Sequence, residues 1–73
     1  MPKLYSAKEI IKALKRAGFM VISQRGSHIK LRGLHNSKMQ TTIVPNHKTV
    51  AIGTFSSILK QADMTRSEFE QYL

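Results

Sequence analysis

The chain of 73 residues contains no cysteine and no tryptophan, and only four of its residues are acidic. Without cysteine it can form neither a disulfide framework nor a thiolate zinc site. Its longest apolar runs are far too short to cross a bilayer, and residues 1–4 lead into a helix signal instead of a cleavable apolar segment. We therefore expect one small domain, soluble and cytoplasmic, with a thin core and marginal stability.

Negative charge is scarce and unevenly distributed. The chain has 12 Lys and Arg against 4 Asp and Glu, a net charge of +8, and Glu9 is the only acid within residues 1–60. Such a basic body is typical of a protein that binds a polyanion. The charge alone also fits scattered lysines, or a protein whose only partner is an acidic protein. Because Glu9 stands alone, residues 1–60 have no carboxylate cluster for Mg²⁺, and we expect no metal site and no cofactor.

Local signals predict helices at both ends of the chain and strands between them. The first and last helices begin with capping boxes, Ser6 with Glu9 and Thr65 with Glu68. Residues 33–38 form a polar connection rich in turn residues. In chain order, we expect a helix over 7–17, strands over 19–25, 28–32 and 39–44, a helix capped by Gly53 and ending near 62, and a short last helix.

This order predicts an α+β fold, α-β-β-β-α, with a three-stranded antiparallel sheet and the helices packed on one of its faces. Double-stranded-RNA-binding domains have this layout and bind RNA through its shape and its phosphates. The other face of the sheet would then be open.

The first two strands are joined by Gly26-Ser27. A two-residue Gly-X connection suits a type II′ hairpin, in which glycine takes the positive φ of the first central position. This turn would pair Arg25 with His28, Ser23 with Lys30, and Ile22 with Leu31. Because side chains alternate along strands, the open face would hold Ser23, Arg25, His28, Lys30 and Arg32, and the core face Met20, Ile22, Ile29 and Leu31.

Among the candidate site residues, His28 is the best catalytic one. RNA has its own nucleophile, the 2′-OH beside the scissile phosphate, and a histidine can take that proton while nearby cations stabilise the charge. On the residues alone, however, a strand histidine is more often an ordinary residue than a catalyst. His47 is the second candidate, although contacts with the loop backbone or with phosphate explain it better, and His35 is expected to be solvated. Candidate RNA-binding residues are Arg25, Ser27, Lys30, Arg32 and Lys48.

Four motifs follow one another along the chain: Leu14-Lys15-x-Ala17-Gly18-Phe19, Arg25-Gly26-Ser27-His28, Ile43-Val44-Pro45-x-His47 and Gly53-Thr54-x-x-Ser57-Ile58-Leu59-Lys60-Gln61-Ala62. Together they resemble the HicA family, the toxins of bacterial and archaeal toxin–antitoxin pairs, over residues 4–63. The resemblance implies a double-stranded-RNA-binding-like fold and ribosome-independent cleavage of mRNA by a histidine that matches His28. It also implies inhibition by a HicB-type antitoxin in a hetero-oligomeric complex. In one departure, Asp63 stands at a helix end where the family often has glycine.

The leading interpretation is therefore an endoribonuclease toxin that needs no metal. A non-catalytic RNA-binding module of the same fold is the main alternative. A small basic protein that binds only an acidic protein partner is the third.

Overall fold

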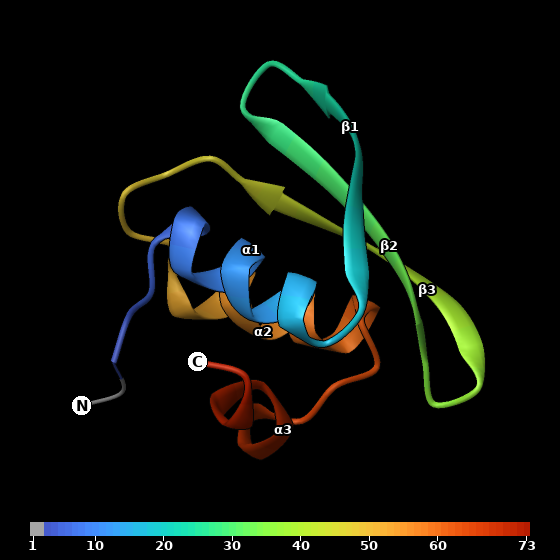
Figure 1. Ribbon diagram of the computed structural model, residues 1–73. Coiled ribbons are helices and arrows are strands. Elements are labelled where there is room, and N and C mark those ends of the chain that lie inside the picture. The colour runs from blue at the N-terminus through green and yellow to red at the C-terminus, as the bar shows by residue number, and fades with distance from the viewer. Residues whose placement is uncertain (1–2) are drawn as a thin grey trace.

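The structure is a computed structural model that describes residues 3–73. The prediction that residues 1–4 lead into a helix falls partly on residues 1–2, which lie outside this range. Three helices pack on one face of a three-stranded antiparallel sheet in which β2 is the central strand (Figure 1). The elements are α1 (Ala7–Arg16), β1 (Phe19–Arg25), β2 (His28–His35), β3 (Lys38–Pro45), α2 (Ile52–Gln61) and α3 (Arg66–Gln71). The predicted α+β fold, similar to that of double-stranded-RNA-binding domains, is confirmed. Within residues 3–73, every helix is too short or too polar to span a membrane.

The core lies between the sheet and the helices. As the helical spacing predicts, Ile10 and Leu14 of α1 and Ile58 of α2 are almost completely buried. Apolar burial of this kind contributes about 25 cal/mol per Å² removed from water. The core also contains a cluster of three aromatic rings, whose centroids lie 4.9–5.3 Å apart, in Tyr5, Phe55 and Phe69.

The helix boundaries follow local capping chemistry where a cap exists. Both predicted capping boxes are present, Ser6 with Glu9 and Thr65 with Glu68. The prediction that Gly53 caps α2 is wrong, because the helix already begins at Ile52. The backbone N–H of Val50 donates to the carbonyl of Tyr5 at 2.8 Å. This buried anchor ends the preceding loop, and the helix starts two residues later.

The predicted polar connection over 33–38 is also wrong, because β2 continues through it to His35. The turn consists of Asn36 and Ser37, both with positive φ (54° and 65°), as a type I′ hairpin requires. Gly33 belongs inside the strand: a Cβ there would lie 2.8 Å from the Cα and Cγ atoms of Phe19. The longer strand continues the alternation, so that Leu34 faces outward and His35 faces the helices.

The β1–β2 hairpin agrees with its prediction near the turn and departs from it farther away. Arg25 pairs with His28, and Gly26 has the expected positive φ of 60°. The predicted pairing of Ile22 with Leu31 is wrong, because Val21 faces Leu31 and Ile22 is the extra residue of a β-bulge.

The bulge and the position of the helices also overturn the predicted burial of Met20 and Ile22. These side chains are 69% and 49% exposed, whereas Ile29 and Leu31 are buried as predicted. Figure 1 shows that the β1–β2 hairpin reaches beyond the helices, so only Phe19 of β1 is buried. Most of β1 is therefore an accessible edge strand.

Candidate functional site

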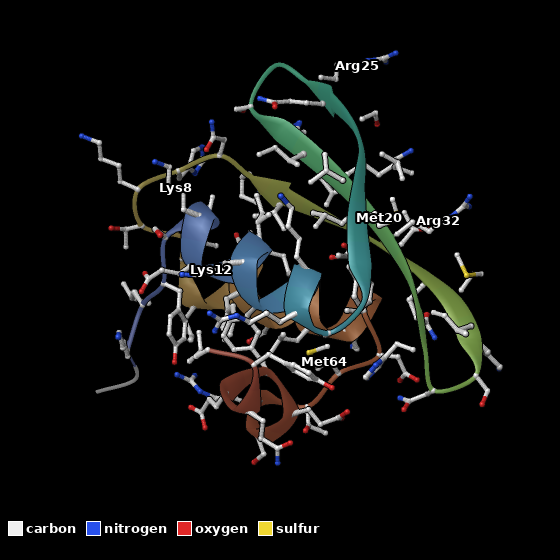
Figure 2. The ribbon with its side chains drawn as sticks, in the orientation of Figure 1. Lys8, Lys12, Met20, Arg25, Arg32 and Met64 are labelled. Atoms are coloured by element: carbon white, nitrogen blue, oxygen red, sulfur yellow. The ribbon has the colours of Figure 1, made fainter. Side chains whose placement is uncertain are left out.

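The open face of the sheet presents basic side chains from β2 at alternating positions. His28, Lys30 and Arg32 are exposed, and each is followed along the strand by a buried residue. Arg25 lies opposite His28 at the end of the β1–β2 hairpin, and Figure 2 shows it there, away from α1. The prediction that these four side chains lie on the open face of the sheet is thus confirmed.

A first cavity of about 560 Å³ lies on this face near the hairpin end. We name it the hairpin cavity; its lining residues are Ser23, Gln24, Arg25, His28, Lys30 and Ile43. None of them is acidic, and the cations of Arg25 and Lys30 form no ion pair within residues 3–73. Two unpaired cations beside an imidazole form a site suited to an anion such as phosphate.

A second cavity of about 480 Å³ lies between the end of β3 and α2. We name it the α2 cavity; its lining includes His28, Ile43, His47, Thr54, Ser57 and Gln61. His28 and Ile43 line both cavities, so His28 stands where the two meet.

The wall of the α2 cavity is fixed by hydrogen bonds between β3 and α2. The buried hydroxyl of Thr42 lies 3.1 Å from the carbonyl of Ile58 and 3.0 Å from Oε1 of Gln61. The same Oε1 accepts from the backbone N–H of Ile43 at 3.1 Å. Because a backbone N–H can only donate, the amide atom of Gln61 that faces Ile43 must be the oxygen. The Nε2 atom of Gln61 therefore points away from this contact.

His47 follows β3 in a loop that its backbone holds in place. Its N–H donates to the carbonyl of Pro45 and its carbonyl accepts from Ala7, both at 2.9 Å. The neighbouring N–H of Asn46 donates to the carbonyl of Ser27 in the β1–β2 turn at 2.6 Å. These contacts bring the His47 side chain to the same cavity as His28, although the two lie 19 positions apart in the sequence.

Three of the predicted RNA-binding residues lie outside both cavities. Nε of Arg32 donates to the Thr41 hydroxyl at 3.3 Å, and Arg32 sits farther along the open face, paired with Met20 (Figure 2). Lys48 is exposed in the loop and Ser27 in the turn, and neither lines the hairpin cavity or the α2 cavity. Arg25 and Lys30 alone join His28 there.

Beyond Arg32 the open face becomes apolar. Met20, Leu34 and Met39 are 69%, 63% and 61% exposed, and the strand pairing places Leu34 directly opposite Met39. We call these three residues the apolar patch. Exposed apolar side chains that gather on one face are typical of a protein interface.

The prediction that His35 is solvated is wrong. Its side chain is only 11% exposed, and its Nε2 lies 3.1 Å from a carboxylate oxygen of Glu68 on α3. The pKa of Glu68 is lowered, first by the backbone N–H of Thr65 and then by the Thr65 hydroxyl and His35. Nearby, Nδ2 of Asn36 donates to Asp63, whose φ of 54° explains how it can replace a helix-ending glycine. His35 thus fastens the β2–β3 hairpin to α3.

Sequence reasoning missed the polar residues that α2 contributes to its cavity. Thr54, Ser57 and Gln61 recur at intervals of three and four residues, which places them on one face of a helix. That spacing was a usable signal, but nothing in the sequence indicates what the face would meet.

The same cavities offer no set of metal ligands. No group of three or more His, Cys, Asp or Glu able to hold a metal occurs within residues 3–73. Apart from the cations of Arg25 and Lys30, the polar side chains that line the two cavities are imidazoles, hydroxyls and amides. No carboxylate is among them.

Comparison with known proteins identifies the family. No curated protein matches this chain. The family model described as the HicA toxin of bacterial toxin–antitoxin systems matches residues 7–64, which include every residue that lines the hairpin and α2 cavities. The chain therefore belongs to the HicA family and is the toxin of a toxin–antitoxin system.

Proposed function

We propose that the chain is an endoribonuclease that cleaves mRNA in the cytoplasm without a ribosome or a metal ion, with His28 as its general base. The observation that supports this most is the position of His28. It is exposed at the junction of two cavities, beside the unpaired cations of Arg25 and Lys30. The match to the HicA family supports the same proposal.

In the proposed reaction, His28 accepts the proton of a ribose 2′-OH. The 2′-oxygen then forms a bond to the adjacent phosphorus, and the bond from phosphorus to the 5′-oxygen of the next nucleotide breaks. The products are a 2′,3′-cyclic phosphate and a 5′-hydroxyl, which takes up one proton. A positioned general base or acid contributes about 10²–10⁴-fold to such a step.

The cations and the second histidine have different parts in this scheme. Arg25 and Lys30 stabilise the negative charge that grows on the phosphoryl oxygens. His47, which lines the α2 cavity with His28, donates the proton to the leaving 5′-oxygen. Metal independence rests on the donor set, because Mg²⁺ prefers carboxylate oxygens and neither cavity has one.

The antitoxin of the pair is a HicB-type protein that covers the open face of the sheet and forms a hetero-oligomeric complex. The apolar patch supports this, since phosphate gains nothing from methionine and leucine whereas a protein interface does. The net charge of +8 favours a partner with an acidic surface, which would also speed association at low salt. Such a partner would keep RNA from His28 by occlusion.

The test is incubation of the purified chain with mRNA in the absence of ribosomes and the presence of EDTA. We expect fragments that end in a 2′,3′-cyclic phosphate and begin with a 5′-hydroxyl. Cleavage that stops with EDTA would contradict metal independence. RNA binding without any cleavage would favour the non-catalytic RNA-binding module instead.

A further inference from the structure

The two cavities that meet at His28 differ in chemistry. The hairpin cavity is cationic, with Arg25 and Lys30 in its wall. The α2 cavity has no lysine or arginine; besides its two histidines it is lined by neutral hydroxyl, amide and apolar side chains. Phosphate prefers the first environment, whereas a nucleobase, with hydrogen-bonding edges and apolar faces, fits the second.

We infer that the α2 cavity binds one unpaired nucleobase of the RNA, next to the scissile phosphate. The inference rests on the proposed ribonuclease activity of His28 and adds a substrate class to it. The scissile phosphate joins two nucleosides, and His28 must contact the atoms around it. A cavity that begins at His28 therefore receives a base from one of those two nucleosides, while the hairpin cavity holds the phosphate chain.

The lining of the α2 cavity supplies what a base needs. Ile43 and Pro45 offer apolar surface. Thr54 and Ser57 offer hydroxyls from α2. A volume of about 480 Å³ falls within the range of about 300–1,000 Å³ common for small-ligand pockets.

Gln61 gives this cavity a polar group with a defined orientation. Its Oε1 is occupied by the Thr42 hydroxyl and the Ile43 N–H, at 3.0 and 3.1 Å. Its Nε2 forms no hydrogen bond within residues 3–73, so its two protons remain available to a base edge. A donor held in this way can favour one base over another.

A pocket for a base requires that the base be unpaired when it enters. A base that is paired in a helix cannot enter a pocket unless it leaves the stack, which costs a few kcal/mol. Although the fold resembles that of proteins that bind double-stranded RNA by shape, we expect this chain to cut single-stranded RNA. We also expect cleavage to depend on the identity of one base beside the scissile bond.

The first experiment compares unstructured RNA oligonucleotides that contain all pairs of neighbouring bases, each alone and annealed to its complement. Wild-type cleavage should vary at least about tenfold with one of the two bases and fall at least about tenfold in the duplex. Equal cleavage of single strand and duplex would overturn the inference. Equal cleavage at every pair of neighbouring bases in the single strand would also overturn it.

The second experiment assigns the preference to the cavity. Gln61→Glu keeps the acceptor for Ile43 but replaces the Nε2 donor, and Thr54→Val removes a hydroxyl that forms no hydrogen bond within residues 3–73. Each should change the ratio of rates between bases about fivefold or more, whereas Ser56→Ala, on α2 but outside the cavity, should leave it unchanged. Because a ratio is measured, a uniform loss of rate from the new carboxylate cancels. Ratios unchanged in both variants would refute the assignment.

A binding measurement separates this inference from the proposed activity. The His28→Gln protein should still bind a fluorescent single strand at least about tenfold tighter than the same sequence as a duplex. If RNA is bound with this preference but the wild type never cuts it, the activity fails and the base site stands. If RNA is cut without any preference, only the base site fails. Absence of binding to both forms would overturn both.

Discussion

Separate alanine substitutions at Leu31 and Ile22 test the β1–β2 register, which positions His28 over the two cavities. Both substitutions delete the same number of carbon atoms, and simple alternation would place the two side chains opposite each other. In the structure Leu31 is 0% exposed, whereas Ile22 is the bulged residue and is 49% exposed. The two substitutions should therefore have very different effects on the free energy of unfolding.

The magnitudes follow from burial. Each buried methylene group contributes about 0.8 kcal/mol, and a cavity adds to the loss, so Leu31→Ala should cost about 3–5 kcal/mol. With half of its side chain in water, Ile22→Ala should cost about 1 kcal/mol. A domain of this length has a total stability of about 4–11 kcal/mol, so the first change should remove a large share of it.

Urea denaturation followed by circular dichroism measures both values. A cost for Ile22→Ala close to that for Leu31→Ala would show that Ile22 lies in the core and that the bulge is absent. A small cost at both positions would show that residues 28–32 are not a half-buried strand.

Lys30→Ala should lower the salt dependence of single-stranded RNA affinity by about 0.7 in the log–log slope, whereas Lys12→Ala, on α1 away from the open face (Figure 2), should leave it unchanged; equal slopes for the two would refute the phosphate role. Leu34→Lys, in the apolar patch, should weaken neutralisation by the antitoxin and preserve cleavage of free RNA; full neutralisation would place the antitoxin elsewhere. The lowered pKa of Glu68, due first to the Thr65 N–H, means that its stabilisation is present above the pKa of an unfolded Glu, about 4.3, and is lost as the pH falls through the folded value. Wild type should therefore exceed Glu68→Gln in stability at neutral pH, and the difference should shrink below about pH 4; a difference that does not change with pH would contradict this.

Features that depend on neighbours in the sequence could be predicted. The capping boxes join residues three apart, and the Gly26-Ser27 turn fixes the pairing of Arg25 with His28 immediately beside it. The grouping of His28 with Arg25 and Lys30 could be predicted for the same reason, because one short hairpin supplies all three and nearly all of the hairpin cavity's lining.

Features that depend on distant segments could not be predicted. An extra residue at Ile22 leaves no mark on a pattern of apolar residues, yet it turns Met20 to the open face, opposite Arg32. The α2 cavity exists because Gln61 and Thr42 fasten α2 to β3, a contact across 19 positions. Likewise, His35 is buried only because α3 brings Glu68 to it.

The cleavage rate of His28→Gln on single-stranded mRNA shows whether His28 is the general base. Glutamine keeps the polarity and much of the bulk of the exposed His28 side chain but cannot accept a proton near neutral pH, so the fold and antitoxin binding should persist. We expect a loss of about 10²–10⁴-fold in cleavage with RNA binding retained. A folded His28→Gln protein that cuts RNA at nearly the wild-type rate would contradict this expectation.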